Sequence, residues 1–261
     1  MKKLTLAVGI ISLMLIALGC SKRKAEITPD MASSDEALFQ MGEQFIKKDP
    51  EKGRLYFRQI IDSFPKSFYA QRAKLAIADS YFEKGDEGSM IIAASEYREF
   101  ITLFPYSPSA AYAQFQIAMT FYKKALKPGR DQSKTQQALA EFRNVITRFP
   151  ESEEAGEARE MLLDCEQRLT SHSLTIAEHY YKVRAYRAAI KRLTAILTDF
   201  PEYKGMDKVY WLLGDAHFKA RAYEQSTPFY RKLISDHPES KYVKKAQKRL
   251  QEIEKTEQEK K

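Results

Sequence analysis

Residues 56–67, Tyr-Phe-Arg-Gln-Ile-Ile-Asp-Ser-Phe-Pro-Lys-Ser, contain the pattern that decides the fold. An amphipathic stretch ends in a ring-bearing residue followed by proline. Proline stops a helix because it lacks the backbone N–H and disfavours helical geometry in the residue before it. The same pattern closes four further stretches, and the five prolines are Pro65, Pro105, Pro150, Pro201 and Pro238. Five copies predict a repeat protein of helix pairs, in which no unit buries its apolar face alone.

The register before each proline is also regular. Twelve residues earlier stands a small residue, in order Gly53, Ala93, Ala138, Ala189 and Ser226. Eight residues earlier stands a ring or a leucine, in order Phe57, Tyr97, Phe142, Leu193 and Tyr230. Small residues let helices approach, and the rings fill the space beside them. This pattern resembles the tetratricopeptide family, so the predicted fold is all-α: a tetratricopeptide-repeat superhelical solenoid of five helix pairs with a C-terminal capping helix.

Two insertions interrupt the repeat. Residues 123–137 contain a Pro-Gly pair typical of a turn, and Asp131 or Ser133 is expected to cap the helix that follows. Residues 152–170 have helical periodicity and are expected to continue, straight or kinked, toward Tyr181 as one long helix.

The N-terminus predicts a lipoprotein. Residues 1–19 combine a charged start with a short apolar run, which is typical of a signal peptide. Cys20 follows directly and resembles the acylated cysteine of a bacterial lipobox; the alternative is an ordinary signal peptide cut near Gly19. Residues 20–34 would then be the lipidated cysteine and a flexible tether to the membrane, with Ser34 opening the first helix. We expect repeats one to three over residues 35–150 and the long helix, repeats four and five and the cap over residues 151–261.

Catalytic and metal-binding patterns are absent from the sequence. It has no glycine-rich phosphate loop, no nucleophile elbow and no histidine pair with metal-ligand spacing, so we expect neither enzymatic activity nor a cofactor. Cys165 lies on an apolar helical stripe and is expected to be a buried thiol. The net charge of +8 allows nucleic-acid binding, but the basic residues are mostly interleaved with acidic ones and densest at the C-terminal helix. A solvated surface, or a patch for a partner or an anionic lipid surface, explains them better.

Two further segments extend the resemblance. Residues 174–181, Leu-Thr-Ile-Ala-Glu-His-Tyr-Tyr, and the approach from Arg130 to residues 138–142 resemble the BamD (also called ComL) family of outer-membrane assembly lipoproteins. The resemblance implies binding to the periplasmic domains of BamA, to other lipoproteins of the BAM complex and to unfolded outer-membrane protein clients. The alternatives are another outer-membrane repeat lipoprotein, such as a pilus-secretin pilotin or a cell-wall machinery adaptor, and a lipid-anchored enzyme.

The family also implies roles for individual residues. Phe64 and Tyr69 match the N-terminal region implicated in recognising the terminal aromatic signal of clients, although Phe64 equally suits a helix-end core residue. Arg192 matches an arginine linked to communication with BamA; the alternative is a surface ion pair with Glu178 or Asp199. Rings on the first helices of the repeats are candidates for lining a peptide groove, with packing between helices as the alternative: Tyr69, Phe82, Tyr112, Phe115, Tyr122 and Tyr181.

Overall fold

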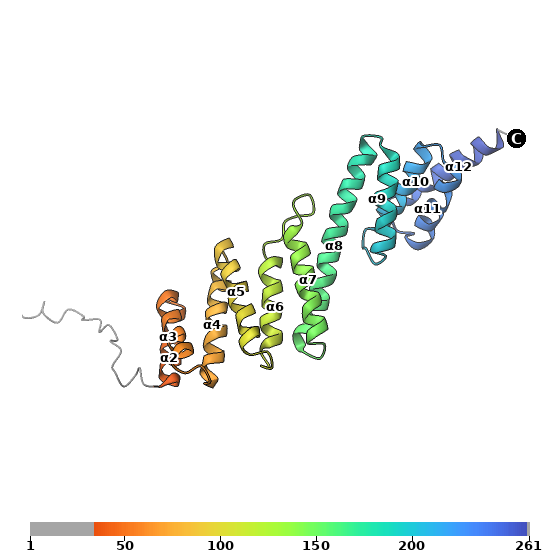
Figure 1. Cartoon of the computed structure of the whole chain (residues 1–261). Helices are drawn as coiled ribbons and strands as arrows, with labels where there is room; N and C mark the ends of the chain where they lie inside the picture. The colour runs from red at the N-terminus through yellow and green to blue at the C-terminus, as the bar shows by residue number, and fades with distance from the viewer. Residues whose placement is uncertain (1–33, 260–261) are drawn as a thin grey trace, which may run out of the picture. The chain divides into compact units, whose positions relative to one another are not determined.

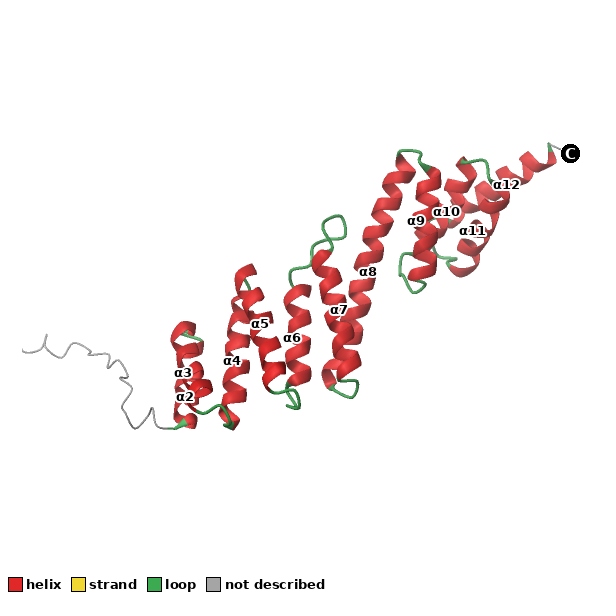
Figure 2. Cartoon of the chain, viewed as in Figure 1, coloured by secondary structure: helices red, strands yellow, loops and turns green. Residues whose placement is uncertain are grey.

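The computed structural model describes residues 34–259, and within this range the chain forms helices joined by turns and loops, without strands (Figure 2). Cys20, the signal peptide and nearly all of the tether lie outside the described residues. Figure 1 labels the eleven helices: α2 (Asp35–Ile46), α3 (Pro50–Ser63), α4 (Phe68–Lys84), α5 (Glu87–Leu103), α6 (Ala110–Tyr122), α7 (Ser133–Arg148), α8 (Glu153–Lys182), α9 (Tyr186–Asp199), α10 (Met206–Lys219), α11 (Tyr223–Asp236) and α12 (Val243–Gln258). They confirm the five predicted pairs and the terminal helix.

The chain divides into two compact units between Ala70 and Gln71, within α4. In the first unit, the Ser34 hydroxyl accepts the backbone N–H of Ala37 at 3.1 Å and caps α2 as expected. The helices α2 and α3 pack closely, and a Cβ atom built on Gly42 would lie 2.2 Å from the ring of Phe57. A larger residue at position 42 would therefore push the two helices apart.

In the second unit, each helix from α5 onward packs against the next one in the chain. Three clusters of buried side chains form its core. The first joins α4, α5 and α6, the second joins α6, α7 and α8, and the third joins α8 to α12. The ring or leucine eight residues before each of the last four prolines is fully buried in these clusters, and Phe57, which precedes Pro65, is fully buried in the first unit, which confirms the packing role predicted from the register.

The ring-bearing residue before each proline is the C-cap of a second helix. Its backbone φ lies between −130° and −139°, outside helical values, and its N–H still donates to the carbonyl four residues earlier. The residues are Phe64, Phe104, Phe149, Phe200 and His237. The proline that follows cannot donate a further helical hydrogen bond, so the helix ends there.

The helix α8 confirms the long mid-chain helix and runs for 30 residues without interruption. The Ser152 hydroxyl caps its first turn. Before α7 the N-cap position is Gln132, whose side chain makes no cap hydrogen bond, whereas the carboxylate of Asp131, one of the two expected caps, accepts the backbone N–H of Ser133 at 3.3 Å. The Gln132 side-chain amide donates to the carbonyls of Lys127 and Arg130 at 2.9 and 3.1 Å, so it ties the loop together from within.

The terminal helix α12 covers the last pair. Ala246 and Ile253 are buried, whereas most of its other residues are exposed. Tyr242, just before α12, stacks on Trp211 of α10 with ring centroids 5.9 Å apart. This one-sided packing agrees with the predicted capping role.

Candidate partner-binding surfaces

The predicted client-binding residues Phe64 and Tyr69 lie in the first unit, at the end of α3 and the start of α4. The Tyr69 ring packs against the rings of Phe39 and Phe68, with centroids 5.3 and 5.8 Å away. Both Phe64 and Tyr69 are half-buried, while Phe68 is 70% exposed. Ser67 fixes the turn, because its hydroxyl bonds to the carboxylate of Asp35 and accepts the N–H of Tyr69. The result is a partly exposed aromatic surface, in which Phe68 is the member that the sequence analysis missed.

Arg192 lies on α9 in the second unit, and its side chain is exposed. Among the described residues it forms neither a hydrogen bond nor an ion pair. Glu178, one of the two partners considered for it, instead forms an ion pair with Lys208 of α10. The guanidinium is therefore available to a group outside the chain.

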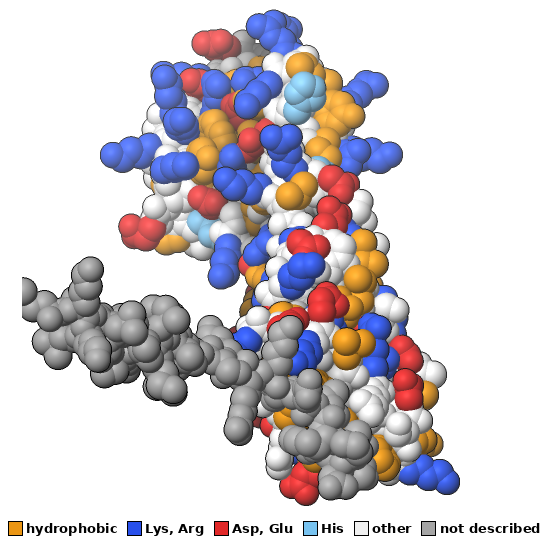
Figure 3. Space-filling view, turned by 90° about the vertical axis from the view of Figure 1, so that its left-hand side faces the viewer, with side chains coloured by type: hydrophobic (Ala, Val, Ile, Leu, Met, Phe, Trp, Pro, Cys, Tyr) orange, Lys and Arg blue, Asp and Glu red, His pale blue; other side chains and the backbone are white. Residues whose placement is uncertain are grey.

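Net charge is distributed unevenly along the chain. Residues 182–261 hold 19 of the 43 Lys and Arg residues and 11 of the 35 Asp and Glu residues, so this stretch carries the whole net charge of +8. Residues 1–181 are neutral overall, with 24 residues of each sign. Lys and Arg side chains crowd the surface of the C-terminal helices (Figure 3). The sequence analysis placed the excess mainly on α12, whereas α9 contributes as well.

The exposed cations of α9 form a group that has no acidic partners. Arg187, Lys191 and Arg192 are all exposed, and they take part in no ion pair among residues 34–259. The spacing of four residues brings Arg187 and Lys191 to the same side of the helix, with Arg192 next to Lys191. Such a group attracts acidic partners over about the Debye length, roughly 8–10 Å at physiological salt.

Several rings considered for a peptide groove are used for packing between helices. The hydroxyl groups of Tyr112, Tyr122 and Tyr181 donate to the carboxylates of Asp79, Asp164 and Asp215, respectively. Phe115 is buried at 8% exposure. The packing alternative therefore holds for these four residues.

Two carboxylates, half-buried Asp79 and buried Asp215, hold neighbouring helices in register, and the sequence analysis missed both. Asp79 of α4 accepts hydrogen bonds from the hydroxyls of Tyr97 and Tyr112 at 2.5 and 2.8 Å. Burial, the largest cause, raises the pKa of Asp79 above its usual value. Burial also raises the pKa of Tyr97 and Tyr112, so both remain neutral donors. The signal was present in the sequence, because Asp79 directly follows the small residue of a first helix.

The second carboxylate, Asp215, occupies the same place in α10, and its side chain is 2% exposed. It lies 3.1 Å from Lys219 Nζ and 3.1 Å from Arg249 Nε, and Tyr181 donates to it as well. These partners come from α8, α10 and α12. Asp215 therefore joins three helices of the C-terminal half, which is the part that carries the excess positive charge.

The described residues offer no site for metal or thiol chemistry. No cluster of three histidine, cysteine or acidic side chains within residues 34–259 is placed to hold a metal ion. Cys165 is buried in the cluster of α6, α7 and α8, as predicted, and burial raises the pKa of its thiol to about 12. A thiol with so high a pKa is a poor nucleophile at neutral pH. None of the described helices combines the length and the hydropathy needed to cross a membrane.

Comparison with known proteins places the chain in a family. A family profile described as outer membrane lipoprotein (YfiO) matches residues 31–219, and a tetratricopeptide-repeat profile matches residues 208–240. The outer membrane protein assembly factor BamD of Caulobacter vibrioides is 31% identical over 142 residues, a match that covers 54% of this chain and less than half, 46%, of that protein.

Two other relatives match over most of their length. The BamD proteins of Haemophilus influenzae and Neisseria gonorrhoeae are 22% and 25% identical over 222 and 230 residues. These matches cover 81% and 83% of this chain, and 82% and 84% of the relatives. The lipoprotein profile spans nearly all of the helical repeats, from the residues before α2 to the end of α10. The chain therefore belongs to the YfiO (BamD) family of outer membrane lipoproteins with tetratricopeptide repeats.

Proposed function

We propose that this protein is a non-enzymatic scaffold subunit of the outer-membrane β-barrel assembly (BAM) complex. It would bind the periplasmic domains of BamA, the other lipoproteins of the complex and unfolded outer-membrane protein clients, and promote insertion of the clients. The names of its relatives, which are outer membrane protein assembly factors, support this proposal. The structural observation that supports it most is the group of cations on α9 without acidic partners among the described residues, because such a group can bind an acidic partner.

The partner surface is centred on Arg192. A guanidinium engages a carboxylate with two parallel hydrogen bonds, whereas lysine offers only a point charge. Arg187 and Lys191 would add long-range attraction, and Asp215 holds α8, α10 and α12 together beneath this half of the molecule. The positive charge of α9 would attract an acidic surface on BamA, and the two parallel hydrogen bonds of the Arg192 guanidinium would orient it.

The substitution Arg192→Glu tests the partner surface. We expect capture of purified BamA periplasmic domains to fall at least about thirtyfold, because losing one member of a desolvated charge pair typically costs about 2–5 kcal/mol and about 1.4 kcal/mol is tenfold in affinity. The thermal midpoint should stay within about 2 °C, because Arg192 has no partner among residues 34–259 and surface changes of this kind stay within about 0.5 kcal/mol. Arg159→Glu is a matched control, because Arg159 is also exposed and, within the described part of the chain, its guanidinium forms no ion pair and donates to the Pro150 carbonyl at 3.4 Å.

Binding that survives Arg192→Glu, or that falls equally with Arg159→Glu, would show that the docking surface lies elsewhere. A thermal midpoint that drops together with binding would instead assign Arg192 a structural role.

The client surface would be the aromatic group of the first unit. Phe64, Phe68 and Tyr69 offer ring faces to an aromatic client residue, and each ring pair contributes about 0.5–1.5 kcal/mol beyond burial. A photo-crosslinker at Tyr69 should capture a synthetic peptide that ends in phenylalanine, and should capture less of the same peptide ending in serine. Leu55 is the matched control position, because it is 66% exposed and lies on α3 of the same unit. Stronger capture at Leu55 would contradict this placement.

The anchor would be an acylated Cys20, which lies outside the described residues. Mass spectrometry of the mature N-terminus should find cleavage after Gly19 and a lipid-modified cysteine. The change Cys20→Ala should release the protein from membranes while its helical content stays the same. An unmodified Cys20 in the wild-type protein would disprove the anchor.

A further inference from the structure

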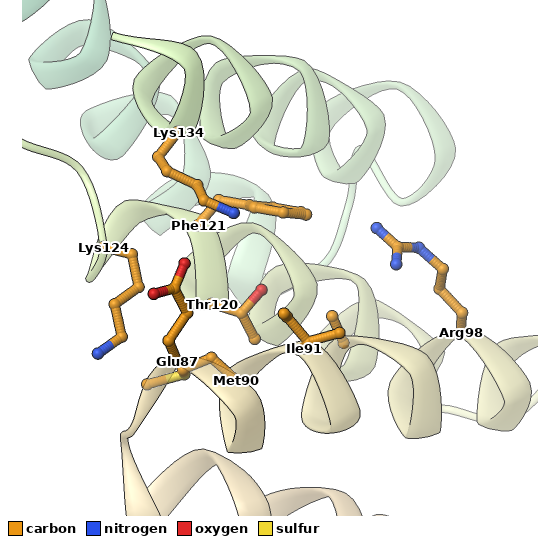
Figure 4. A pocket seen from close by; sticks show the side chains of 9 residues that line it. Glu87, Met90, Ile91, Arg98, Thr120, Phe121, Lys124 and Lys134 are labelled. Carbon is orange, nitrogen blue, oxygen red and sulfur yellow. The ribbon is translucent and has the colours of Figure 1, made fainter. Parts of the chain in front are cut away.

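A hollow in the second unit lies between α5, α6 and the start of α7 (Figure 4). It has a volume of about 80 Å³ and an apolar floor formed by Met90 and Ala94, which are 5% and 3% exposed. The ring of Phe121 forms one wall, and Ile91 forms the lip. The hollow is too small for a helix, but it would take one apolar side chain. Most of its lining comes from second helices of the repeats, whereas the rings first considered for a peptide groove lie mainly on first helices.

The residue at the lip of the hollow is apolar, whereas the residue at the equivalent position of every other repeat is polar. Ile91 and Ile92 are 62% and 41% exposed. Ile91 stands fourteen residues before Pro105, and the same position in the other four repeats holds Glu51, Gln136, Arg187 and Glu224. Packing of the repeat therefore does not require an apolar residue at this position. Contiguous exposed apolar residues on a soluble helix indicate a surface that another molecule covers.

The rim of the hollow is basic. Lys134 Nζ lies 5.4 Å from the centroid of the Phe121 ring, and the Arg98 guanidinium lies 5.8 Å from it on a different helix. Lys124 completes the rim and donates to the Gly85 carbonyl at 2.6 Å. Figure 4 shows Lys134 and Arg98 pointing toward the hollow from α7 and α5.

The acidic groups near the hollow leave part of this positive charge unbalanced. Glu87 is the one acid among the lining residues. Glu141 lies beyond the rim and forms an ion pair with Arg98 at 3.1 Å. Lys134 forms no ion pair within residues 34–259, so its ammonium group is available to a bound carboxylate.

We propose that this hollow binds an acidic segment of a partner protein, with one apolar side chain inserted between Ile91 and Phe121. Carboxylates on either side of the inserted residue would meet Lys134 and Arg98. The apolar lip is the reason why the inserted side chain should be apolar. The basic rim is the reason why the residues on either side of it should be acidic. The lining of the hollow includes neither Arg192 nor any member of the aromatic group of the first unit, so the inference does not depend on the proposed function.

The test uses the full-length chain in mild detergent and a panel of labelled, end-blocked peptides, Gly-Asp-Glu-X-Asp-Glu-Gly, in which X is Leu, Ile or Phe. We expect at least one peptide to bind by fluorescence anisotropy, more weakly as salt rises. Replacing X by Ser, or the acids by Lys, should abolish binding. Ile91→Gln, which copies the residue of repeat three, should weaken binding about tenfold, as expected when one aliphatic contact is lost. Lys134→Glu should weaken it by a similar factor.

Leu103→Gln is the matched control, because Leu103 is 52% exposed on the same helix but does not line the hollow. It should leave peptide binding unchanged. Failure of every acidic peptide to bind, or an equal loss with Ile91→Gln and Leu103→Gln, would overturn the proposal. Two further results would also overturn it by identifying another occupant. One is flotation with phosphatidylglycerol vesicles that depends on Ile91 in the Cys20→Ala protein. The other is self-association that Ile91→Gln removes.

Discussion

Two aspartates at equivalent places in the repeat, half-buried Asp79 and buried Asp215, have different kinds of partner. Asp79 in repeat two and Asp215 in repeat five each follow a small residue of a first helix, and each faces the tyrosine of the second helix. Four residues later, repeat two has Glu83 and repeat five has Lys219. Asp215 therefore has cationic partners, whereas Asp79 has two tyrosine hydroxyls and a nearby acid that helps to raise its pKa.

Repeat three has neither the aspartate nor the tyrosine hydroxyl, whereas repeats one and four have the longer acids Glu43 and Glu178 at this place, with Phe57 and Leu193 on the second helix. Repeat three has Met119 where repeat two has Asp79, and Phe142 where repeat two has Tyr97. Phe142 is fully buried in an apolar cluster. An aspartate at this position is therefore tolerated where a hydroxyl donor faces it, because a buried carboxylate without hydrogen bonds is costly. The difference between repeats two and five suggests that cations make the acid a source of stability.

The largest effect should follow removal of Asp215. Asp215→Ala leaves Lys219 and Arg249 without their buried partner, so we expect the free energy of unfolding in urea to fall by about 3 kcal/mol. Asp79→Ala should cost less, about 1–2 kcal/mol, because only hydroxyl hydrogen bonds are lost. Asp236→Ala is a control, since solvent screens this exposed i,i+4 pair with Lys232 and its loss should leave the urea midpoint nearly unchanged. Equal losses for Asp79 and Asp215 would show that the cations add nothing.

The next effect concerns transfer of the acid into repeat three. Met119→Asp alone places a carboxylate against the Phe142 ring, and we expect a loss of about 2–3 kcal/mol because no hydroxyl faces it. Adding Phe142→Tyr should recover about 1 kcal/mol of that loss. Phe142→Tyr by itself should be destabilising, since its hydroxyl would be buried without an acceptor. Urea unfolding of the four proteins gives the coupling energy directly, and a coupling near zero would refute the pairing.

A smaller effect should appear in the pH dependence of Asp79→Asn. Because the pKa of Asp79 is raised in the folded state, its ionisation opposes folding as pH rises from the ordinary value of 3.8 through the raised value. An asparagine oxygen still accepts from Tyr97 and Tyr112 and does not ionise. The stability of the variant relative to wild type should therefore increase as pH rises from about 4 to 7. A pH-independent difference in the urea midpoint would contradict the raised pKa.

Features set by local sequence were predictable from the sequence. The ring-bearing residue and proline at the end of each repeat predicted where the second helices end. The periodicity of residues 152–170 predicted α8, and the apolar stripe on it predicted the burial of Cys165. These depend on residues within one or two turns of each other, where spacing alone decides which side chains meet.

Long-range contacts were harder to predict. Asp215 and Arg249 are 34 residues apart, and nothing in either local segment links them before the helices pack. The role of Gln132 before α7 was missed because its side chain donates to the carbonyls of its own loop, and glutamine is not among the residues favoured at an N-cap. The binding roles of Phe64, Tyr69 and Arg192 remain predictions, since a partner is needed to test them.

The smallest expected effect converts the Asp79 site toward the Asp215 site. Glu83→Lys places a cation four residues after Asp79, in the favourable order of acid before base on a helix. The pKa of Asp79 should fall, because the nearby negative charge that helps to raise it becomes positive. Asp79 is part of the packed α4–α5 interface, but Glu83 is exposed, so solvent screening limits the gain in unfolding free energy at pH 7 to about 0.5 kcal/mol.

Carboxyl-carbon NMR titration of Asp79 in wild type and Glu83→Lys gives the pKa change, and urea unfolding at pH 7 gives the gain. The gain should shrink as pH falls toward 4, since a protonated Asp79 no longer attracts the new cation. Glu157→Lys on the exposed side of α8 makes the same change in net charge far along the chain from Asp79, and should leave its pKa unchanged. If both variants change the pKa of Asp79 equally, the overall charge of the protein sets that pKa. The residue four positions later would then not explain the difference between repeats two and five.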